Sequence, residues 1–398
     1  MLYTYPDYYK DFKCIAERCE ATCCAGWQIV VDEEALDRYK EYIDKGADEN
    51  VETSSLISQY SSFKERLRQS IDWQEGVFKQ DECRRCAFLN GRNLCDMYTA
   101  LGEDSLCYTC TSYPRHIEEY EDVREVTLSL SCPEVARLVM EKKDKTSFYD
   151  VEKLDETEIY EDYDEFDVLM FGILQDARNI MIDIMQDRTM DISTRANLLW
   201  CMAEDMQDSI DEGAIFDCQD IIESYEQLIG HADKAEDVLC KMGRSYSQLS
   251  TKDRYTVGLS MFKYLYQLEV LNEDWEHDVD QASLAIFGAN QNHYESLSTA
   301  FNQWLRANMP NWQIQCEQIV VYFLATYMCG GVYDGQVASK VKMSVASIFY
   351  IHHLLMALWN MQGYELSDHD IIRMVYRYSR ELEHSDINLE ELESCFQS

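Results

Sequence analysis

The chain of 398 residues exceeds the usual size of a single hydrophobic core, so its length predicts two domains. Its hydrophobic content of 46% and aromatic content of 12% are typical of a folded globular protein. The 74 acidic residues outnumber the 35 basic ones and give a formal net charge of −39. This charge argues against nucleic-acid and anionic-lipid partners and favours cationic ones. A solvated acidic surface explains the same charge.

Neither a secretory signal nor a membrane span is predicted. The first seven residues lack the basic and apolar regions of a signal peptide. The longest apolar stretches, 319–333 and 344–359, fall short of the ~18–20 residues that cross a bilayer. We therefore expect a cytoplasmic protein. In that reducing compartment, clustered cysteines bind metal more often than they form disulfides.

The first third of the chain holds ten of the sixteen cysteines, in two groups and one isolated residue. Between the two groups, Asp32 precedes two glutamates and is typical of a helix N-cap, because acidic side chains there interact favourably with the helix dipole. A polar stretch at 50–62 separates this predicted helix from the second group. The ten cysteines are Cys14, Cys19, Cys23, Cys24, Cys83, Cys86, Cys95, Cys107, Cys110 and Cys132.

The second cysteine group lies in a segment with the signals of short strands. Asn90-Gly91 between apolar runs predicts a tight hairpin turn. Alternating apolar and polar residues at 125–131 predict a half-buried strand that ends at Cys132. Residues 1–149 are therefore predicted to form a small Cys-rich α+β module that binds metal.

The remainder of the chain has the period of α-helices. Residues 150–167 contain ten acids and one lysine and predict the junction between two domains. From about residue 168 onward, apolar residues recur at helical spacing, with an interruption at Pro310. His352-His353 is predicted to pack in this helical core rather than to ligate metal. The predicted fold is mainly α, with the helical domain at 150–398 following the Cys-rich module.

The spacing Cys83-x2-Cys86-x20-Cys107-x2-Cys110 is the strongest chemical signal in the sequence. Two Cys-x2-Cys turns of this kind, or knuckles, can direct four thiolates toward one ion. Sulfur ligands suit both Zn²⁺ and an iron–sulfur cluster, and the spacing does not distinguish between the two. The first group is less regular, because adjacent cysteines rarely ligate one ion together. The ten thiols can fill two four-ligand sites with two left over, or surround one cluster and leave several unused.

Several enzymatic signatures are absent from the sequence. It contains no glycine-rich dinucleotide or methyltransferase loop, no phosphate-binding loop and no zinc-protease or serine-hydrolase motif. Donor-binding residues are therefore not predicted. A polar cluster near the C-terminus offers candidate acid–base groups, although ordinary helix-face ion pairs explain the same pattern. This cluster contains Tyr376, Tyr378, Arg380, Glu381, Glu383, His384, Ser385 and Asp386.

The cysteines and their neighbours carry a family resemblance. The relevant runs are Cys14-x4-Cys19-x3-Cys23-Cys24-Ala-Gly-Trp27, Cys86-Ala-Phe-Leu89, Cys95-Asp-Met-Tyr98 and Cys107-x2-Cys110-x2-Tyr-Pro-Arg115. They resemble the cysteine-cluster proteins described as zinc- or iron-chelating, although the first group departs from the evenly spaced C-x2-C-x2-C-C form of that superfamily. The similarity to one branch, the flagellin lysine-N-methylases, continues through Tyr333-Asp-Gly335 and Tyr378-Ser-Arg-Glu-Leu-Glu-His-Ser-Asp386 and so covers nearly the whole chain.

The resemblance implies a bacterial enzyme that transfers methyl groups from S-adenosylmethionine to lysines of flagellin. It also implies an iron–sulfur cluster, [4Fe–4S] in preference to zinc, with ligands among the ten N-terminal cysteines. It assigns no catalytic residue, so Tyr378, Arg380, Glu381 and His384 are candidates from the polar cluster alone. The competing hypothesis is a non-catalytic zinc- or iron–sulfur-binding protein that assembles or escorts a flagellar partner, which the missing donor-binding loop favours.

Overall fold

The computed structural model describes residues 1–45, 62–153, 166–242 and 250–397, which divide into two compact units. The larger unit contains Met1–Asp11, Ile117–Ser131 and Ala136–Ser398, and the smaller unit contains Phe12–His116 and Cys132–Val135. These units do not follow the predicted division, because position 149/150 falls inside a strand of the larger unit. Most of the predicted acidic junction and of the polar stretch at 50–62 lies outside the described residues.

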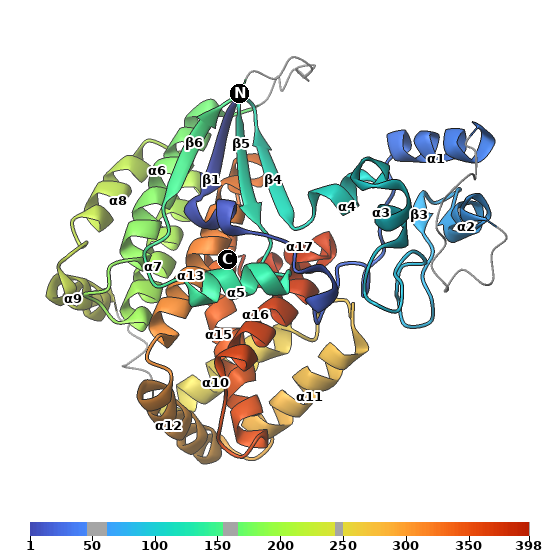
Figure 1. Cartoon of the computed structure of the whole chain (residues 1–398). Helices are drawn as coiled ribbons and strands as arrows, with labels where there is room; N and C mark the ends of the chain where they lie inside the picture. Colours follow the sequence, from blue (N-terminus) through green and yellow to red (C-terminus); the bar gives the residue numbers. More distant parts are fainter. Residues whose placement is uncertain (46–61, 154–165, 243–249, 398) are drawn as a thin grey trace. The chain divides into compact units, whose positions relative to one another are not determined.

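The described elements confirm a mainly helical fold with a small amount of sheet (Figure 1). The strands of the four-stranded sheet are β1 (Leu2–Pro6), β4 (Arg115–Tyr120), β5 (Val123–Leu128) and β6 (Phe148–Glu152). The helices from the sheet onward are α5 (Pro133–Glu141), α6 (Val168–Met185), α7 (Ile192–Asp211), α8 (Asp217–Glu226), α9 (Ala232–Met242), α10 (Thr251–Tyr264), α11 (Glu273–Phe287), α12 (Gln291–Asn308), α13 (Trp312–Tyr327), α14 (Gly331–Asp334), α15 (Val337–Met361), α16 (Asp368–Glu383) and α17 (Asp386–Ser394).

Apart from the first two residues of β4, the sheet belongs to the larger unit, and its strand order is β4-β5-β1-β6. Strand β1 is parallel to β5 and antiparallel to β6. The half-buried strand predicted at 125–131 is buried on both faces, because α13 packs on β5 and the polar positions also point inward. There Glu125 forms a bidentate ion pair with Arg178 of α6, which explains how its carboxylate is tolerated in the interior.

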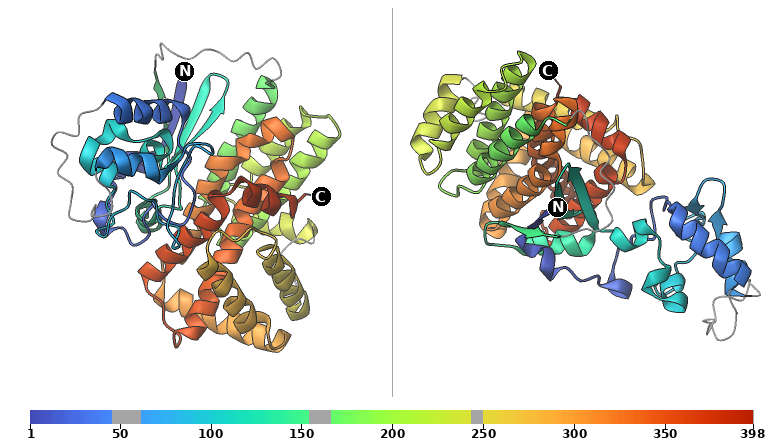
Figure 2. Two further views of the ribbon diagram at one scale, coloured as in Figure 1. Left: turned by 90° about the vertical axis from the view of Figure 1, so that its right-hand side faces the viewer. Right: turned by 90° about the horizontal axis from the view of Figure 1, so that it is seen from above.

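Helix α15 is the central core helix of the larger unit. It contacts α7, α13 and α11, and Figures 1 and 2 show it among these helices. It is longer than the apolar stretch 344–359 suggested, and among the described residues it is the one helix long and apolar enough to cross a bilayer by length and composition. Of its most apolar window, 72% is buried inside the protein, as is usual for a core helix.

The two histidines of α15 are packing residues, as predicted. His353 is buried beside Tyr294, whose hydroxyl lies 3.1 Å from the Nε2 atom. The Nδ1 atom lies 2.9 Å from the Phe349 carbonyl. The ring proton is therefore on Nδ1, and Nε2 accepts the hydrogen bond from the Tyr294 hydroxyl. Burial lowers the pKa of His353 to about 4, and burial with the adjacent His353 lowers that of His352 to about 3.

These neutral histidines predict acid sensitivity. Their pKa values lie below those of the unfolded chain, so their contribution to stability is complete above about pH 6.5 and is lost as the pH falls toward 4. On going from pH 7 to pH 5, each buried histidine is expected to reduce the free energy of unfolding by about 2 kcal/mol. Urea unfolding of the wild type and of His353→Gln at pH 7 and pH 5 checks this. An equal loss in both proteins would assign the effect to other groups.

The smaller unit is built from short elements around an aromatic core. Asp32 caps α1 as predicted, since its Oδ1 accepts from the Ala35 amide at 2.8 Å. Its Oδ2 accepts from the Tyr108 amide at 2.7 Å and so holds the start of α4 beside α1. The elements are α1 (Glu33–Lys45), α2 (Phe63–Ser70), β2 (Ile71–Asp72), β3 (Val77–Phe78), α3 (Asp96–Leu101) and α4 (Tyr108–Ser112).

The predicted hairpin forms, but its turn differs from the prediction. Leu89 and Cys95 make an antiparallel bridge, and the Asn90 amide donates to the Leu94 carbonyl at 2.9 Å. Asn93, with a φ of 58°, supplies the left-handed backbone conformation that was expected from Asn90-Gly91. The Asn90 carboxamide instead accepts from backbone amides across the turn. The turn therefore places Cys95 at the start of α3.

Candidate functional site

Five cysteines of the smaller unit gather in its hydrophobic core. Cys86 and Cys107 are buried there, and Cys24, Cys95 and Cys110 pack against the same cluster. We call these five residues the thiol core. All sixteen cysteines of the chain lie in described segments, and all are thiols.

The backbone explains how the thiol core assembles. The Cys86 amide donates to the Cys24 carbonyl at 2.8 Å, which joins the two cysteine groups. The Leu89–Cys95 bridge adds Cys95. The Asp32 cap and the hydrogen bond from Thr109 Oγ1 to the Val30 carbonyl, 2.9 Å long, fix the knuckle that carries Cys107 and Cys110.

The thiols of the core influence one another electrostatically. A hydrogen bond between the side chains of Cys107 and Cys110 lowers the pKa of Cys107 and raises that of Cys110. Cys24 and Cys95 also lie close enough to raise the pKa of Cys110. Burial, with Cys95 and Cys107 nearby, raises the pKa of Cys86 to about 12. A bound cation would stabilise the thiolates and so offset the cost of ionising several buried thiols close together.

The thiols that lie together are all among the ten predicted ligands, but they differ from the four that the paired spacing favoured. Cys83 and Cys14 are exposed, whereas Cys24 and Cys95 lie with Cys107 and Cys110. Cys132 is buried near Cys19 and Cys23, and burial raises its pKa to about 12. An all-sulfur donor set in one core fits the chemistry of an iron–sulfur or zinc centre. Within the described segments, no three His, Cys, Asp or Glu side chains are already arranged as a metal site.

A second polar site lies in the larger unit at the C-terminal end of α16. Ser367 and Asp370 form a capping box that starts this helix. Helical periodicity then places Arg380, Glu383 and His384 on one face. That face meets the end of β5 and the helix α13, and the residues joined there are called the Glu383 network. Its members are Ser129, Ser131, Tyr322, Tyr327, Arg380, Glu383 and His384.

Glu383 is the centre of this network. Its Oε2 atom accepts hydrogen bonds from Tyr322 at 2.5 Å, from Ser129 at 2.9 Å and from Tyr327 at 3.2 Å. Burial, together with the Glu383 charge, raises the pKa values of both tyrosines well above their ordinary range, so they remain hydroxyl donors. Burial, Asp7 and Glu383 likewise raise the pKa of Tyr8. The arrangement is a carboxylate surrounded by hydroxyl groups.

Two of the predicted catalytic residues join the network through Ser131. The Ser131 hydroxyl lies 2.6 Å from that of Ser129 and 2.9 Å from His384 Nε2. Arg380 donates from Nε to the Ser131 carbonyl at 2.9 Å. Burial, with Arg380 nearby, lowers the pKa of His384 to about 3, so its imidazole is neutral at pH 7.

The other two predicted catalytic residues have different partners from Arg380 and His384. The buried Tyr378 hydroxyl lies 3.1 Å from Ser347 Oγ and its ring stacks on Tyr350, so its contacts are those of a core residue. Glu381 Oε2 accepts from the Leu271 amide at 3.0 Å and holds a loop. The structure does not bring these two side chains together with Arg380 and His384.

The two tyrosines and the two serines of the network were not predicted from the sequence. Tyr322 and Tyr327 sit in the apolar run 319–333, where their hydroxyl groups were the available signal. Ser129 lies in the strand predicted to be half-buried, where a serine would face solvent. A buried strand bearing hydroxyls opposite a helix with two tyrosines was therefore not expected.

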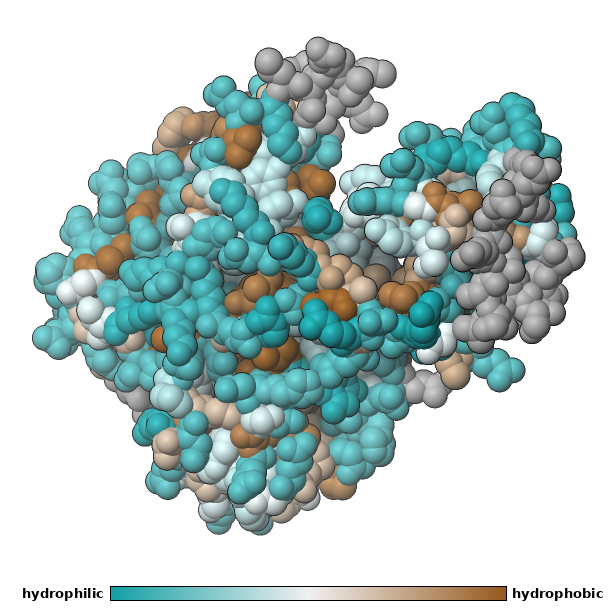
Figure 3. Space-filling view, in the orientation of Figure 1, coloured by the Kyte–Doolittle hydropathy of each residue, from teal (hydrophilic) through white to brown (hydrophobic). Residues whose placement is uncertain are grey.

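The Glu383 network is suited to bind and deprotonate an amine. A carboxylate attracts an ammonium group, and neutral hydroxyl and imidazole groups nearby can orient it. Arg380, Glu383 and His384 are part-exposed as residues, whereas the Oε1 atom of Glu383 is buried. The remaining surface visible in Figure 3 is largely hydrophilic, with small separated hydrophobic areas.

Comparison of the sequence with known proteins finds relatives over part of the chain. The flagellar biosynthetic protein FliU of Salmonella muenchen is 28% identical over 141 residues, which are 35% of this chain and 78% of that protein. Lysine-N-methylases of Salmonella choleraesuis (strain SC-B67) and Salmonella typhimurium (strain LT2) are 26% and 28% identical over 141 residues, 35% of this chain. The matched region spans 33% of each lysine-N-methylase. No solved structure matches the chain.

A family model described as the FliB lysine N-methylase C-terminal domain matches residues 178–398. This match includes α16 and both tyrosines of α13. It covers more than half of the chain and agrees with the resemblance of the C-terminal block. The chain belongs to the FliB lysine N-methylase family.

Proposed function

We propose that this protein transfers methyl groups from S-adenosylmethionine to lysine side chains of flagellin. Membership of the FliB family supports lysine methylation, and the name of the FliU relative, a flagellar biosynthetic protein, supports a flagellar substrate. The net charge of −39 supports S-adenosylmethionine and flagellin as partners, since a sulfonium donor and a lysine-bearing surface are attracted to an acidic protein. A cytoplasmic location suits the reduced thiols.

The observation that carries the proposal is the carboxylate of Glu383 among hydroxyl groups. A lysine must lose its proton before its nitrogen can attack a methyl group. Glu383 would bind the ammonium group and accept that proton, directly or through Ser129 and Ser131, whose hydroxyls are 2.6 Å apart. The N–C bond then forms as the sulfonium S–C bond breaks, which leaves S-adenosylhomocysteine and the methylated amine.

The remaining network residues would orient the amine. Tyr322 and Tyr327 hold the carboxylate at 2.5 Å and 3.2 Å and fix the direction of its lone pairs. Neutral His384 and the cation of Arg380 are anchored to Ser131. Arg380 is thus a positioning residue, because its positive charge would repel a lysine that approached it directly.

We also propose that the thiol core holds an iron–sulfur cluster, with zinc as the alternative. Its ligands would come from the five cysteines that share one core, Cys24, Cys86, Cys95, Cys107 and Cys110, of which one cluster or one zinc ion takes at most four. Such a cluster supplies, when bound, an iron that can ligate the amino and carboxylate groups of the methyl donor. The low pKa of Cys107 relative to a free thiol supports thiolate ligation at that position.

The decisive experiment is incubation of the protein with labelled S-adenosylmethionine and purified flagellin, followed by mass mapping of modified lysines. We expect increments of one methyl group on lysine and none on a flagellin whose lysines have been acetylated beforehand. Acetylation removes the amine nucleophile and is the matched substrate control. Absence of methyl gain with metal-loaded protein would contradict the proposed activity.

A further inference from the structure

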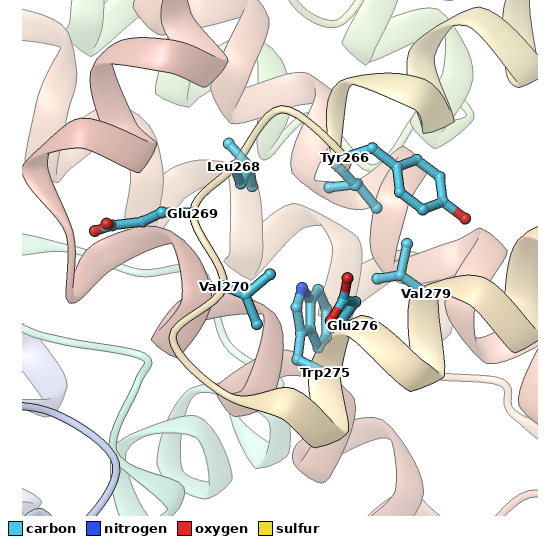
Figure 4. Close-up of a pocket in the computed structure, with 8 residues that line it drawn as sticks. Tyr266, Leu268, Glu269, Val270, Trp275, Glu276 and Val279 are labelled. Carbon is cyan, nitrogen blue, oxygen red and sulfur yellow. The ribbon is translucent and has the colours of Figure 1, made fainter.

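The larger unit contains a small recess that is separate from the Glu383 network. Figure 4 shows it between the loop that follows α10 and the first turns of α11. Its volume is about 40 Å³. The residues around it are Leu265, Tyr266, Leu268, Glu269, Val270, Trp275, Glu276 and Val279.

The walls of the recess are apolar, with one carboxylate at the entrance. Leu268, Val270 and Val279 surround the space, and the indole of Trp275 faces it (Figure 4). Glu276 is exposed and is one of the two acidic residues that line the recess. The carboxylate of Glu269 points away from the recess, where it accepts a hydrogen bond from Ser385.

The recess is held in shape by the C-terminal helices. The Leu271 amide donates to Glu381 at 3.0 Å, and the Glu269 amide donates to Asn388 Oδ1 at 2.7 Å. The carboxamide of Asn388 donates in return to the Glu269 carbonyl at 3.0 Å. Trp275 rests on Tyr378, with ring centroids 6.4 Å apart. Tyr378 and Glu381, which do not reach the Glu383 network, therefore both support this recess.

Size and chemistry together define a ligand class. A cavity of this volume holds about three water-sized groups, enough for the end of a long unbranched side chain but not for a nucleoside. Apolar side chains suit methylene groups, and an indole and a carboxylate that line the same recess suit a cation, including a methylated ammonium. A lysine side chain and its N-methylated forms combine these features.

We propose that this recess binds a lysine or N-methyllysine side chain of the protein substrate other than the one being methylated. The inference rests on the proposed function in so far as the substrate is a lysine-bearing protein. Glu381 supports the recess and Glu383 centres the network, so the two sites lie on opposite sides of the last turn of α16. One lysine would hold the substrate while another enters the network.

The test is a binding measurement without methyl donor, so that it does not depend on catalysis. Fluorescently labelled peptides that differ in one residue, lysine, trimethyllysine, acetyllysine or norleucine, are titrated with the full chain and followed by anisotropy. We expect the lysine and trimethyllysine peptides to bind more tightly than the two uncharged ones, by about threefold or more. All titrations are repeated with Glu383→Gln, which removes the network carboxylate and leaves the recess intact.

Two substitutions localise the binding. Glu276→Gln removes the carboxylate at the exposed entrance, and Val270→Trp fills the entrance from a residue that is 41% exposed. Each is expected to weaken binding of the trimethyllysine peptide by about threefold or more in both backgrounds, since an exposed cation–aromatic–carboxylate contact has that strength. Glu226→Gln, an exposed glutamate on α8 that removes the same charge, is the matched control and should bind as the wild type does.

Three outcomes would overturn the proposal. They are absence of binding by the wild type, equal binding of the acetyllysine peptide, and unchanged binding by both recess variants. Loss of methyl transfer with this binding pattern intact would contradict the proposed function alone. If the protein methylates flagellin and both recess variants bind the trimethyllysine peptide as the wild type does, the recess proposal alone is contradicted.

Discussion

Replacing Glu383 by glutamine is expected to lower the rate of methyl transfer to flagellin by about a hundredfold, the usual contribution of one general base. Glutamine has nearly the same shape and can still accept hydrogen bonds from Tyr322 and Tyr327, so the packing of α16 against α13 is retained. It can neither attract an ammonium group nor take its proton. The measurement is initial rate with labelled donor at saturating flagellin, together with the melting temperature.

A pH profile separates proton acceptance from a purely structural role. If Glu383 accepts the lysine proton, raising the pH supplies more neutral amine and partly rescues Glu383→Gln, whereas a variant damaged only in structure gains no such advantage. Glu390→Gln, an exposed position on α17, removes the same charge outside the network and should match the wild type. Full activity of Glu383→Gln at neutral pH would remove Glu383 from the mechanism.

The C-terminal block shows what helical periodicity can and cannot predict. The sequence places Arg380 and His384 on one face of a helix, and the structure has both at Ser131. The sequence cannot say what that face meets, because the partner residue, Ser131, lies about 250 positions earlier, just after β5. Tyr378 and Glu381 belong to the same helix but meet Ser347 and the Leu271 amide instead. Candidates chosen by residue type alone therefore mix two sites.

The cysteine region shows a different limit. Paired knuckles predicted Cys83 as a partner of Cys107 and Cys110, because spacing reports only local turns. Which thiols meet is decided by contacts between distant segments, such as the backbone bond that joins Cys86 to Cys24. Of the pair Cys83 and Cys86, only Cys86 enters the core, and Cys83 stays exposed.

The fold class was predictable because it depends on pattern over long windows. Helical spacing from residue 168 onward, and the break at Pro310 between α12 and α13, are local properties that tertiary contacts did not override. The sheet was not predictable in this way. Strand β1 pairs with β5 across more than a hundred residues, which puts the N-terminus into the helical unit and leaves the ten N-terminal cysteines in the smaller unit.

Replacing Cys95 by serine is expected to lower the affinity for bound iron by at least about tenfold, whereas replacing Cys83 should leave it nearly unchanged. Cys95 lies in the thiol core and raises the pKa of Cys110, while Cys83 is exposed. Spacing alone predicts the reverse order, so the pair of variants decides between the structure and the motif. Iron content and the broad absorbance near ~400 nm of anaerobically purified protein are the measurements.

Two further variants make the result interpretable. Cys107→Ser removes the thiol whose pKa is lowered and should lose iron as Cys95→Ser does, whereas Cys240→Ser, at an exposed position on α9, should keep it. Zinc in place of iron, without absorbance in the visible range, would retain the ligand assignment and replace the metal. Equal iron in all four variants would exclude the thiol core as the metal site, because a cluster cannot lose a thiolate ligand without weakening.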